Sequence, residues 1–159
     1  MRIAVIADTH IPKRAKTLPE GAWKIIKESD AIIHAGDVLT RRFLDELVEV
    51  KPLYAVRGNN DDSLPELPES LEIELAGVPI AIIHDSGNKK ARARRMRKRF
   101  PNARVVVFGH SHIPWNEEHD GVLLFNPGSP TDRRRQPQHT MGMLTLADGK
   151  ILAEIIELK

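Results

Sequence analysis

Residues 104–112, Arg104-Val105-Val106-Val107-Phe108-Gly109-His110-Ser111-His112, join a short apolar run to two histidines. The apolar run predicts a short, fully buried β-strand over residues 104–108. Gly109 then permits a sharp turn, because it has no Cβ atom to restrict the backbone. His110 and His112 therefore follow the C-terminal end of a strand, where open α/β sheets usually carry their sites. Alone, this pair is a weak signal, since two loop histidines can simply be solvated.

The composition sets broad limits on the kind of protein. The 159 residues suit one domain with its own core, so we expect a single domain over residues 1–159. Hydrophobic residues make up 41% and charged residues 29%, which is typical of a soluble globular chain. No apolar run approaches a membrane span, and residues 3–7 are too short for the core of a signal peptide.

The absence of cysteine excludes a disulfide framework and a thiolate metal site. Any metal must then be held by His, Asp, Glu or Asn, and the cytoplasm is the expected compartment. The net charge is only +2 at pH 7, so the overall charge does not by itself imply a nucleic-acid partner.

Strand and helix patterns alternate through the first third of the chain. Thr17 and Thr40 are the expected N-caps of two helices, one ending near residue 29 and the other at Pro52. The order strand, helix, strand, helix, strand predicts parallel pairing with right-handed crossovers. Residues 113–121 are expected to form a loop. The expected strands cover residues 2–7, 31–34, 53–56, 71–75, 79–83, 104–108, 122–125, 141–146 and 151–158.

Seven side chains of metal-ligand type stand at or just after the ends of five of these strands. Each alone reads as an ordinary loop residue, but their shared placement favours one site. Each divalent ion needs about four to six donors, so seven side chains can hold two ions only if one of them bridges. A carboxylate is suited to bridging, because its two oxygens can reach two ions. The seven residues are Asp8, His10, Asp37, Asn59, His84, His110 and His112.

Six motifs occur along the chain in the order Asp8-x-His10, Gly36-Asp37, Gly58-Asn59-x-Asp61, His84, Gly109-His110-x-His112 and Asn126-Pro127-Gly128-Ser129. This series resembles that of the calcineurin-like metallophosphoesterases, and most closely their small phosphodiesterase branch, which includes a retromer subunit. The resemblance covers nearly the whole chain. It implies an α/β fold, an αββα sandwich of two mixed β-sheets flanked by helices. It also implies a dimetal-dependent phosphoesterase, foremost a phosphodiesterase, acting on a phosphate ester.

The resemblance further implies a role for each residue. Asp37 would bridge the two ions and hold a hydroxide that attacks phosphorus in line with the leaving oxygen. Asn60 and Asp61 are further candidates, for contact with the substrate or for support of the ligands. Mn, Ni, Fe, Co and Zn all suit such ligands, with manganese among the candidates. Asp8, His10 and His112 would bind the first ion, and Asn59, His84 and His110 the second.

Two positions depart from the family pattern. Many members have histidine where this chain has Asn60, and asparagine cannot act as a general acid near neutral pH. Poor leaving groups should therefore react slowly. Asp85 replaces the glycine that often follows the metal-binding histidine, and it either narrows the site or adds charge to it. For His34 we favour a core or supporting role over catalysis, and for Ser129 a role in a backbone turn over that of a nucleophile.

Positive charge is concentrated in two segments. Lysine or arginine fills eight of the eleven positions from Lys89 to Arg99, and Ala93, Met96 and Phe100 have helical spacing. A solvated outer helix is the favoured interpretation, because aromatic residues for base stacking make up only 4% of the chain. A nucleic-acid partner stays open. Arg133-Arg134-Arg135 is expected near the mouth of the site, where it would attract an anionic substrate.

A second class of function also stays open: a non-catalytic module that binds protein or nucleic acid, as in the retromer subunit. Such a scaffold could lose ligands freely, whereas every ligand position here carries a competent residue. The sequence is equally compatible with a monomer and a homo-oligomer.

Overall fold

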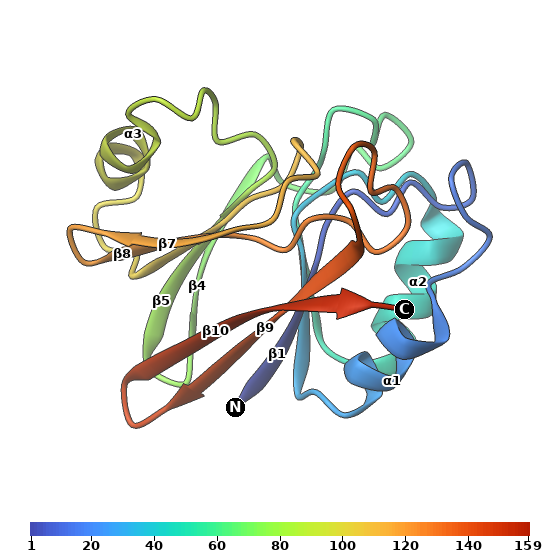
Figure 1. Cartoon of the computed structure of the whole chain (residues 1–159), viewed down its shortest axis with the longest axis horizontal. Coiled ribbons are helices and arrows are strands. Elements are labelled where there is room, and N and C mark those ends of the chain that lie inside the picture. The colour runs from blue at the N-terminus through green and yellow to red at the C-terminus, as the bar shows by residue number, and fades with distance from the viewer.

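Two mixed β-sheets of five strands each lie face to face, and helices cover their outer faces (Figure 1). The computed structural model describes all residues, 1–159. The first sheet has the order β10 (Lys150–Leu158), β9 (His139–Ala147), β1 (Arg2–Ile6), β2 (Ala31–His34) and β3 (Leu53–Ala55). The second has the order β4 (Ser70–Leu75), β5 (Val78–Ile83), β6 (Val105–Val107), β8 (Val122–Asn126) and β7 (Trp115–His119). The expected αββα sandwich is confirmed.

The central strands are apolar throughout because both of their faces are covered. In β1, Ile3 and Val5 contribute to the core between the sheets, while Ala4 and Ile6 pack toward the helices of the first sheet. This two-sided burial explains why β1 reads as a continuous hydrophobic run instead of an alternating one. The inner core also takes Val105 and Val107 of β6 from the opposite sheet.

Three helices complete the sandwich. The first two, α1 (Glu20–Lys27) and α2 (Arg41–Val50), cover the outer face of the first sheet (Figure 1). Thr40 caps α2 as predicted, since its Oγ1 accepts a hydrogen bond from Phe43 N at 3.4 Å. The third helix, α3 (Arg92–Arg99), lies on the outer face of the second sheet, where its Met96 and the C-cap residue Phe100 are buried. No helix here is both long and apolar enough to span a membrane.

Thr17 is not the N-cap of α1, contrary to the prediction. Pro19 occupies that position and makes no side-chain cap hydrogen bond. Thr17 Oγ1 instead accepts a hydrogen bond from Trp23 Nε1 at 3.0 Å, which ties the preceding loop to the helix.

The loop predicted over residues 113–121 is also wrong, because Trp115–His119 forms the edge strand β7. This strand pairs antiparallel with β8. The basic helix is shorter than residues 89–99. Residues 89–91 precede it in a turn that is fastened by Arg95, whose guanidinium donates to the carbonyl oxygens of Ser86, Asn88 and Lys90.

The topology brings the loops of both sheets to one edge of the sandwich, the upper edge in Figure 1. The loop after β1 joins the loop after β2 through Asp8 N, which donates to Gly36 O at 2.9 Å. In the second sheet, Gly109 N donates to His84 O at 3.0 Å and joins the ends of β6 and β5. Every predicted metal ligand lies in one of these loops or at a strand end beside them.

Candidate metal centre

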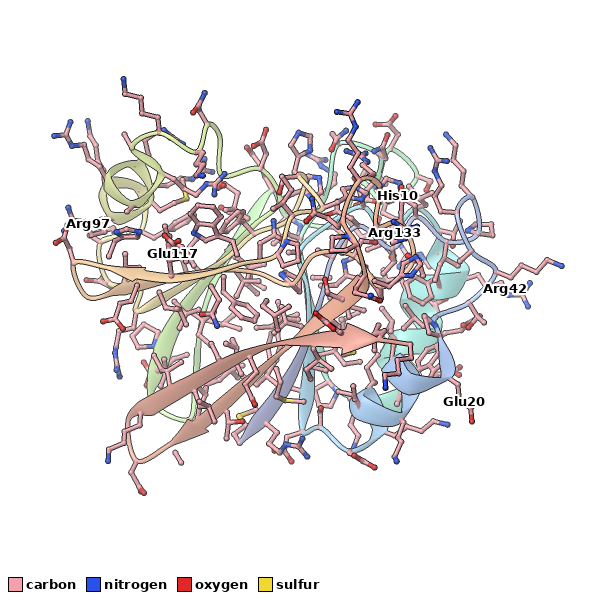
Figure 2. The ribbon with its side chains drawn as sticks, in the orientation of Figure 1. His10, Glu20, Arg42, Arg97, Glu117 and Arg133 are labelled. Carbon is pink, nitrogen blue, oxygen red and sulfur yellow. The ribbon has the colours of Figure 1, made fainter.

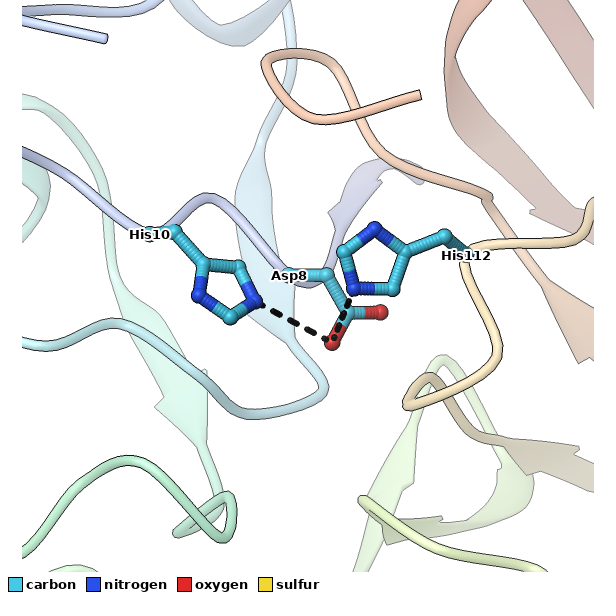
Figure 3. Close-up of side chains that lie close together, drawn as sticks. All are labelled: Asp8, His10 and His112. Atoms are coloured by element: carbon cyan, nitrogen blue, oxygen red, sulfur yellow. Dashed lines mark ion pairs between the residues drawn. The ribbon is translucent and has the colours of Figure 1, made fainter. Parts of the chain in front are cut away.

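Asp8, His10 and His112 form the first part of the cluster (Figure 3). His112 Nε2 lies 3.6 Å from Asp8 Oδ1, and His10 Nε2 lies 4.0 Å from the same oxygen. All three side chains are buried, and these three atoms have no hydrogen-bond partner. A buried polar atom without a partner costs about 1–3 kcal/mol, so three that converge on one point favour a cation-binding site there.

The spacing of these atoms suits a metal ion. Ligand atoms about 2.1 Å from a common ion lie roughly 3.0–3.4 Å from one another in octahedral or tetrahedral geometry. The observed separations of 3.6 and 4.0 Å need only a small contraction to reach that range. His112 Nδ1 donates to Asp132 O at 2.5 Å, since a carbonyl oxygen can only accept. The proton on Nδ1 leaves the Nε2 lone pair of His112 free to bind a metal.

Asn59, His84 and His110 form the second part of the cluster. Asn59 Oδ1 lies 2.9 Å from His84 Nε2 and 3.1 Å from His110 Nδ1. His84 Nδ1 donates to Ala35 O at 2.7 Å, so its Nε2 faces the cluster. In both sets, a backbone carbonyl oxygen accepts a hydrogen bond from Nδ1 of one histidine and so orients its ring. Nε2 of that histidine is then left to coordinate a metal.

Asp37 lies between the two sets. Its Oδ2 is 3.3 Å from His10 Nε2 and 3.5 Å from His84 Nε2. Asn60 orients this carboxylate, because its backbone N donates to Oδ1 and its Nδ2 donates to Oδ2, both at 2.9 Å. The position of Asp37 is the one that a bridging ligand would need.

Five of the seven predicted ligands adopt a left-handed backbone conformation, although none is glycine. This conformation is costly for residues with a side chain, and such strain concentrates at functional sites. The strained backbone indicates that these loops are shaped to place the ligand side chains in the cluster. The φ angles are 54° for Asp8, 46° for His10, 61° for Asp37, 71° for His110 and 62° for His112.

Burial and close charges shift the pKa values in the cluster. Burial raises the pKa of Asp8 to about 7, and the charge of Asp37 adds to the shift. Burial lowers the pKa of His84, but the carboxylates of Asp37 and Asp8 outweigh it and raise the value to about 9. Burial raises the pKa of Asp37, but the close imidazoles of His10 and His84 outweigh burial and hold the pKa of Asp37 well below its usual range. Without a metal, protons on Asp8 and His84 offset the negative charge of the cluster.

Metal binding is therefore expected to release protons. Ligands must be deprotonated, and both Asp8 and His84 hold protons more tightly than usual. The apparent affinity for Mn²⁺ should rise with pH most steeply below about 7, where Asp8 and His84 both lose a proton, and less steeply between about 7 and 9, where only His84 does. Calorimetric titrations at pH 6, 7 and 8, each in two buffers of different ionisation enthalpy, give the number of protons released. An affinity that does not change with pH, without proton release, would contradict this electrostatic account.

Asp61 supports the cluster from beneath. Its buried carboxylate accepts hydrogen bonds from Gly58 N at 2.7 Å, and from Asp37 N and Leu39 N at 2.8 Å. Burial raises the pKa of Asp61, and these hydrogen bonds oppose the rise. A fully buried side chain cannot touch substrate, so this geometry favours support of the Asp37 loop.

His34 and Ser129 are placed as the sequence led us to expect. His34 is buried; its Nδ1 accepts from Gly36 N at 3.2 Å, and its Nε2 therefore donates to Thr9 Oγ1 at 2.9 Å. Burial lowers the pKa of His34 to about 3, so its ring is neutral at pH 7. Ser129 Oγ donates to Asp8 O at 2.8 Å and accepts from Asp132 N at 2.8 Å, which fixes the turn beside the first set.

Sequence reasoning overlooked Asp132, whose carbonyl orients His112. Its place three residues after the Asn-Pro-Gly-Ser turn is a signal that could have found it. Asp85 is exposed, and its Oδ2 lies 3.9 Å from His110 Nε2, so it adds charge at the rim without narrowing the buried cluster. Arg134 lies close enough to His112 for its charge to reinforce the lowering of that pKa by burial.

Comparison with known proteins agrees with this geometry. A family model described as the calcineurin-like phosphoesterase superfamily domain matches residues 1–149. The protein named "Probable metallophosphoesterase" from Methanothermobacter thermautotrophicus is 35% identical over 159 residues, covering 98% of this chain and 92% of that protein.

Two solved structures share the fold. One is wild-type Vps29 from Entamoeba histolytica in complex with zinc, with a TM-score of 0.78 and 21% identity over 99% of each chain. The other is described as a novel archaeal phosphodiesterase, with a TM-score of 0.74 and 22% identity over 98% of this chain and all of that one. By its family match, its relatives and its fold, the chain belongs to the calcineurin-like phosphoesterase superfamily.

Proposed function

We propose that the chain is a dimetal-dependent phosphoesterase that prefers phosphodiesters. The observation that carries this proposal is the convergence of Asp8 Oδ1, His10 Nε2 and His112 Nε2, three buried atoms without partners, next to a second set of donors that meets at Asn59 Oδ1. The family match supports phosphoesterase chemistry.

Two bound ions would activate a water molecule as the nucleophile and neutralise charge on the phosphoryl oxygens. The residues of the chain orient the reactants. Asp37 supplies a carboxylate to both sets, and Asn60 holds that carboxylate through two hydrogen bonds. Asn59, Asn60 and His110 are the exposed members of the site, so substrate reaches the cluster past them. Asn60 can donate to a phosphate oxygen but cannot protonate a leaving group.

The charge of Asp85, close to His110, favours a diester over a monoester at the reacting phosphorus. Asp85 stands 3.9 Å from His110 and is exposed at the point of access. A phosphomonoester carries nearly two negative charges at neutral pH and a diester only one, so Asp85 repels the monoester more strongly. The shared fold with a solved archaeal phosphodiesterase supports the same preference.

The test measures hydrolysis of bis-p-nitrophenyl phosphate and of p-nitrophenyl phosphate after treatment with EDTA and addition of Mn²⁺, Ni²⁺, Fe²⁺, Co²⁺ or Zn²⁺. We expect metal-dependent turnover, with the diester preferred. His84→Ala should abolish it, because His84 faces both Asn59 and Asp37. His119→Ala is the matched control, since His119 lies on the edge strand β7 and its side chain hydrogen-bonds to Glu117 of the same strand. No turnover of either ester with any of the metals would overturn the enzyme proposal.

The likeness to Vps29 favours a second candidate, a non-catalytic interaction module. The full set of ligand-type residues argues against it, because a scaffold has no need to keep strained loops and buried atoms without partners. The same assay separates the two functions, since a scaffold would show no metal-dependent turnover even when the ions are bound.

A further inference from the structure

A pocket of about 390 Å³ opens beside the second set of ligands and is lined by Asn59, His84 and His110. This volume is about thirteen times the ~30 Å³ that a water molecule occupies, so the pocket can hold a substituent of a substrate. Only one of its nine lining residues is hydrophobic, which makes it unsuited to an aromatic ring or an acyl chain. The rest of its polar wall comes from separate segments and is charged: Arg57, Glu69, Asp85 and Arg99.

The two arginines of this pocket are available for a ligand. Arg57 forms no ion pair, and its backbone N donates to Pro68 O, which fixes the start of its side chain. Arg99 stands 3.9 Å from Glu69, but both side chains are about half exposed or more. Such an exposed, long pair contributes little, about 0–1 kcal/mol, so Arg99 can exchange Glu69 for a stronger anion.

A second phosphate group is the anion that fits best. The planar guanidinium forms two parallel hydrogen bonds to phosphate oxygens, which lysine cannot do. Asp85 also lines this pocket, and its Oδ2 lies 3.9 Å from His110 Nε2, so the pocket adjoins the candidate metal centre. The pocket thus continues from the reacting centre, and a phosphate held there would belong to the molecule whose ester is cleaved.

We propose that this pocket is a subsite for a second phosphate group of the substrate, bound by Arg57 and Arg99. The inference rests on the proposed function, and it narrows the substrate class to phosphate esters that carry another phosphate on the same molecule. A free phosphate ion is too small to occupy the candidate metal centre and this subsite at the same time.

The kinetic test uses two substrates with the same leaving group: thymidine 5′-(p-nitrophenyl phosphate) and its 3′-phosphorylated form. In the wild-type protein, kcat/KM for the 3′-phosphorylated form should be about tenfold higher or more. That ratio should fall severalfold in Arg57→Ala and in Arg99→Ala, and reach about one in the double variant.

Arg97→Ala is the matched control, because Arg97 shares α3 with Arg99 but does not line the pocket and pairs with Asp120 at 3.4 Å. Figure 2 shows Arg97 beside the β7–β8 hairpin, far from His10. The ratio should be the same in Arg97→Ala as in the wild type. A wild-type ratio near one would overturn the proposal, as would an equal fall in Arg97→Ala, which would indicate only a general effect of positive charge.

Binding gives a readout that does not need turnover. Calorimetry with the Mn²⁺-loaded protein compares thymidine 3′,5′-bisphosphate with thymidine 5′-monophosphate. Tighter binding of the bisphosphate that is lost in the Arg57→Ala/Arg99→Ala variant supports the subsite, and equal binding of the two nucleotides overturns it. If neither ester is hydrolysed, the proposed function fails while this comparison still decides the subsite.

Discussion

Asp37→Asn is expected to lower kcat/KM for bis-p-nitrophenyl phosphate by about 10³-fold or more. The change keeps the shape of the side chain and removes the negative charge that lies 3.3 Å from His10 and 3.5 Å from His84. Because this carboxylate lies between the two sets of ligands, the proposed content of two ions per chain should fall to one or none. Elemental analysis of the dialysed protein measures the metal content beside the kinetics.

Asp62→Asn is the matched control for this variant, since Asp62 is an exposed aspartate on the same loop as Asp61. It should keep the wild-type metal content and rate. An Asp37→Asn protein that retains two ions and more than a tenth of the activity would show that Asp37 does not bridge.

Gly58→Ala is expected to lower the free energy of unfolding by about 1–3 kcal/mol, the usual cost of overpacking. A Cβ atom at Gly58 would overlap the carboxylate and the backbone N of Asp37, and would stand 2.8 Å from Asp37 Cγ. The loops after β2 and β3 would have to separate, which also displaces Asp37 from His84. Urea denaturation in EDTA measures the stability, and titration with Mn²⁺ measures the expected loss of affinity.

Gly21→Ala provides the comparison for Gly58→Ala. Gly21 lies in α1, and an added Cβ would meet only Leu158 Cδ2 at 3.8 Å, an ordinary contact. Alanine should raise helix stability here by roughly 0.5–1 kcal/mol. If both variants were equally stable and bound metal equally well, the close approach of the two loops would not matter to the site.

The sequence predicts the site better than it predicts the arrangement of the strands. Buried strands such as residues 31–34 are marked by continuous apolar runs, and the residues that follow them are of ligand type, so their meeting at one edge could be foreseen. The pairing of β9 with β1 joins segments about 140 residues apart, and no local pattern encodes it. The arrangement in two sheets was predicted only from the resemblance to the calcineurin-like metallophosphoesterases.

The edge strand β7 shows where local patterns fail. Residues 115–119 read Trp-Asn-Glu-Glu-His and are mostly exposed, so they lack the alternation of a half-buried strand. Pairing with β8 makes them a strand, and Asn116 Nδ2 fastens them to Ala153 O of β10 at 2.9 Å. Tertiary contacts decide this element, and propensity cannot reveal them.

The fine geometry of the site also lies beyond sequence patterns. Five non-glycine residues with positive φ could not be foreseen, because left-handed backbone is rare for such residues and is imposed by the surrounding loops. The hydrogen bond from His112 Nδ1 to Asp132 O joins residues twenty positions apart, and only the folded loops bring them together.

The most direct test of the central claim is a crystal structure of the Mn²⁺-loaded protein with anomalous data collected on either side of the metal absorption edge. We predict two anomalous peaks with Asp37 in contact with both. One peak should lie against Asp8 Oδ1, His10 Nε2 and His112 Nε2, and the other against Asn59 Oδ1, His84 Nε2 and His110 Nδ1. A single peak, or peaks that leave those buried atoms without a metal, would contradict the account.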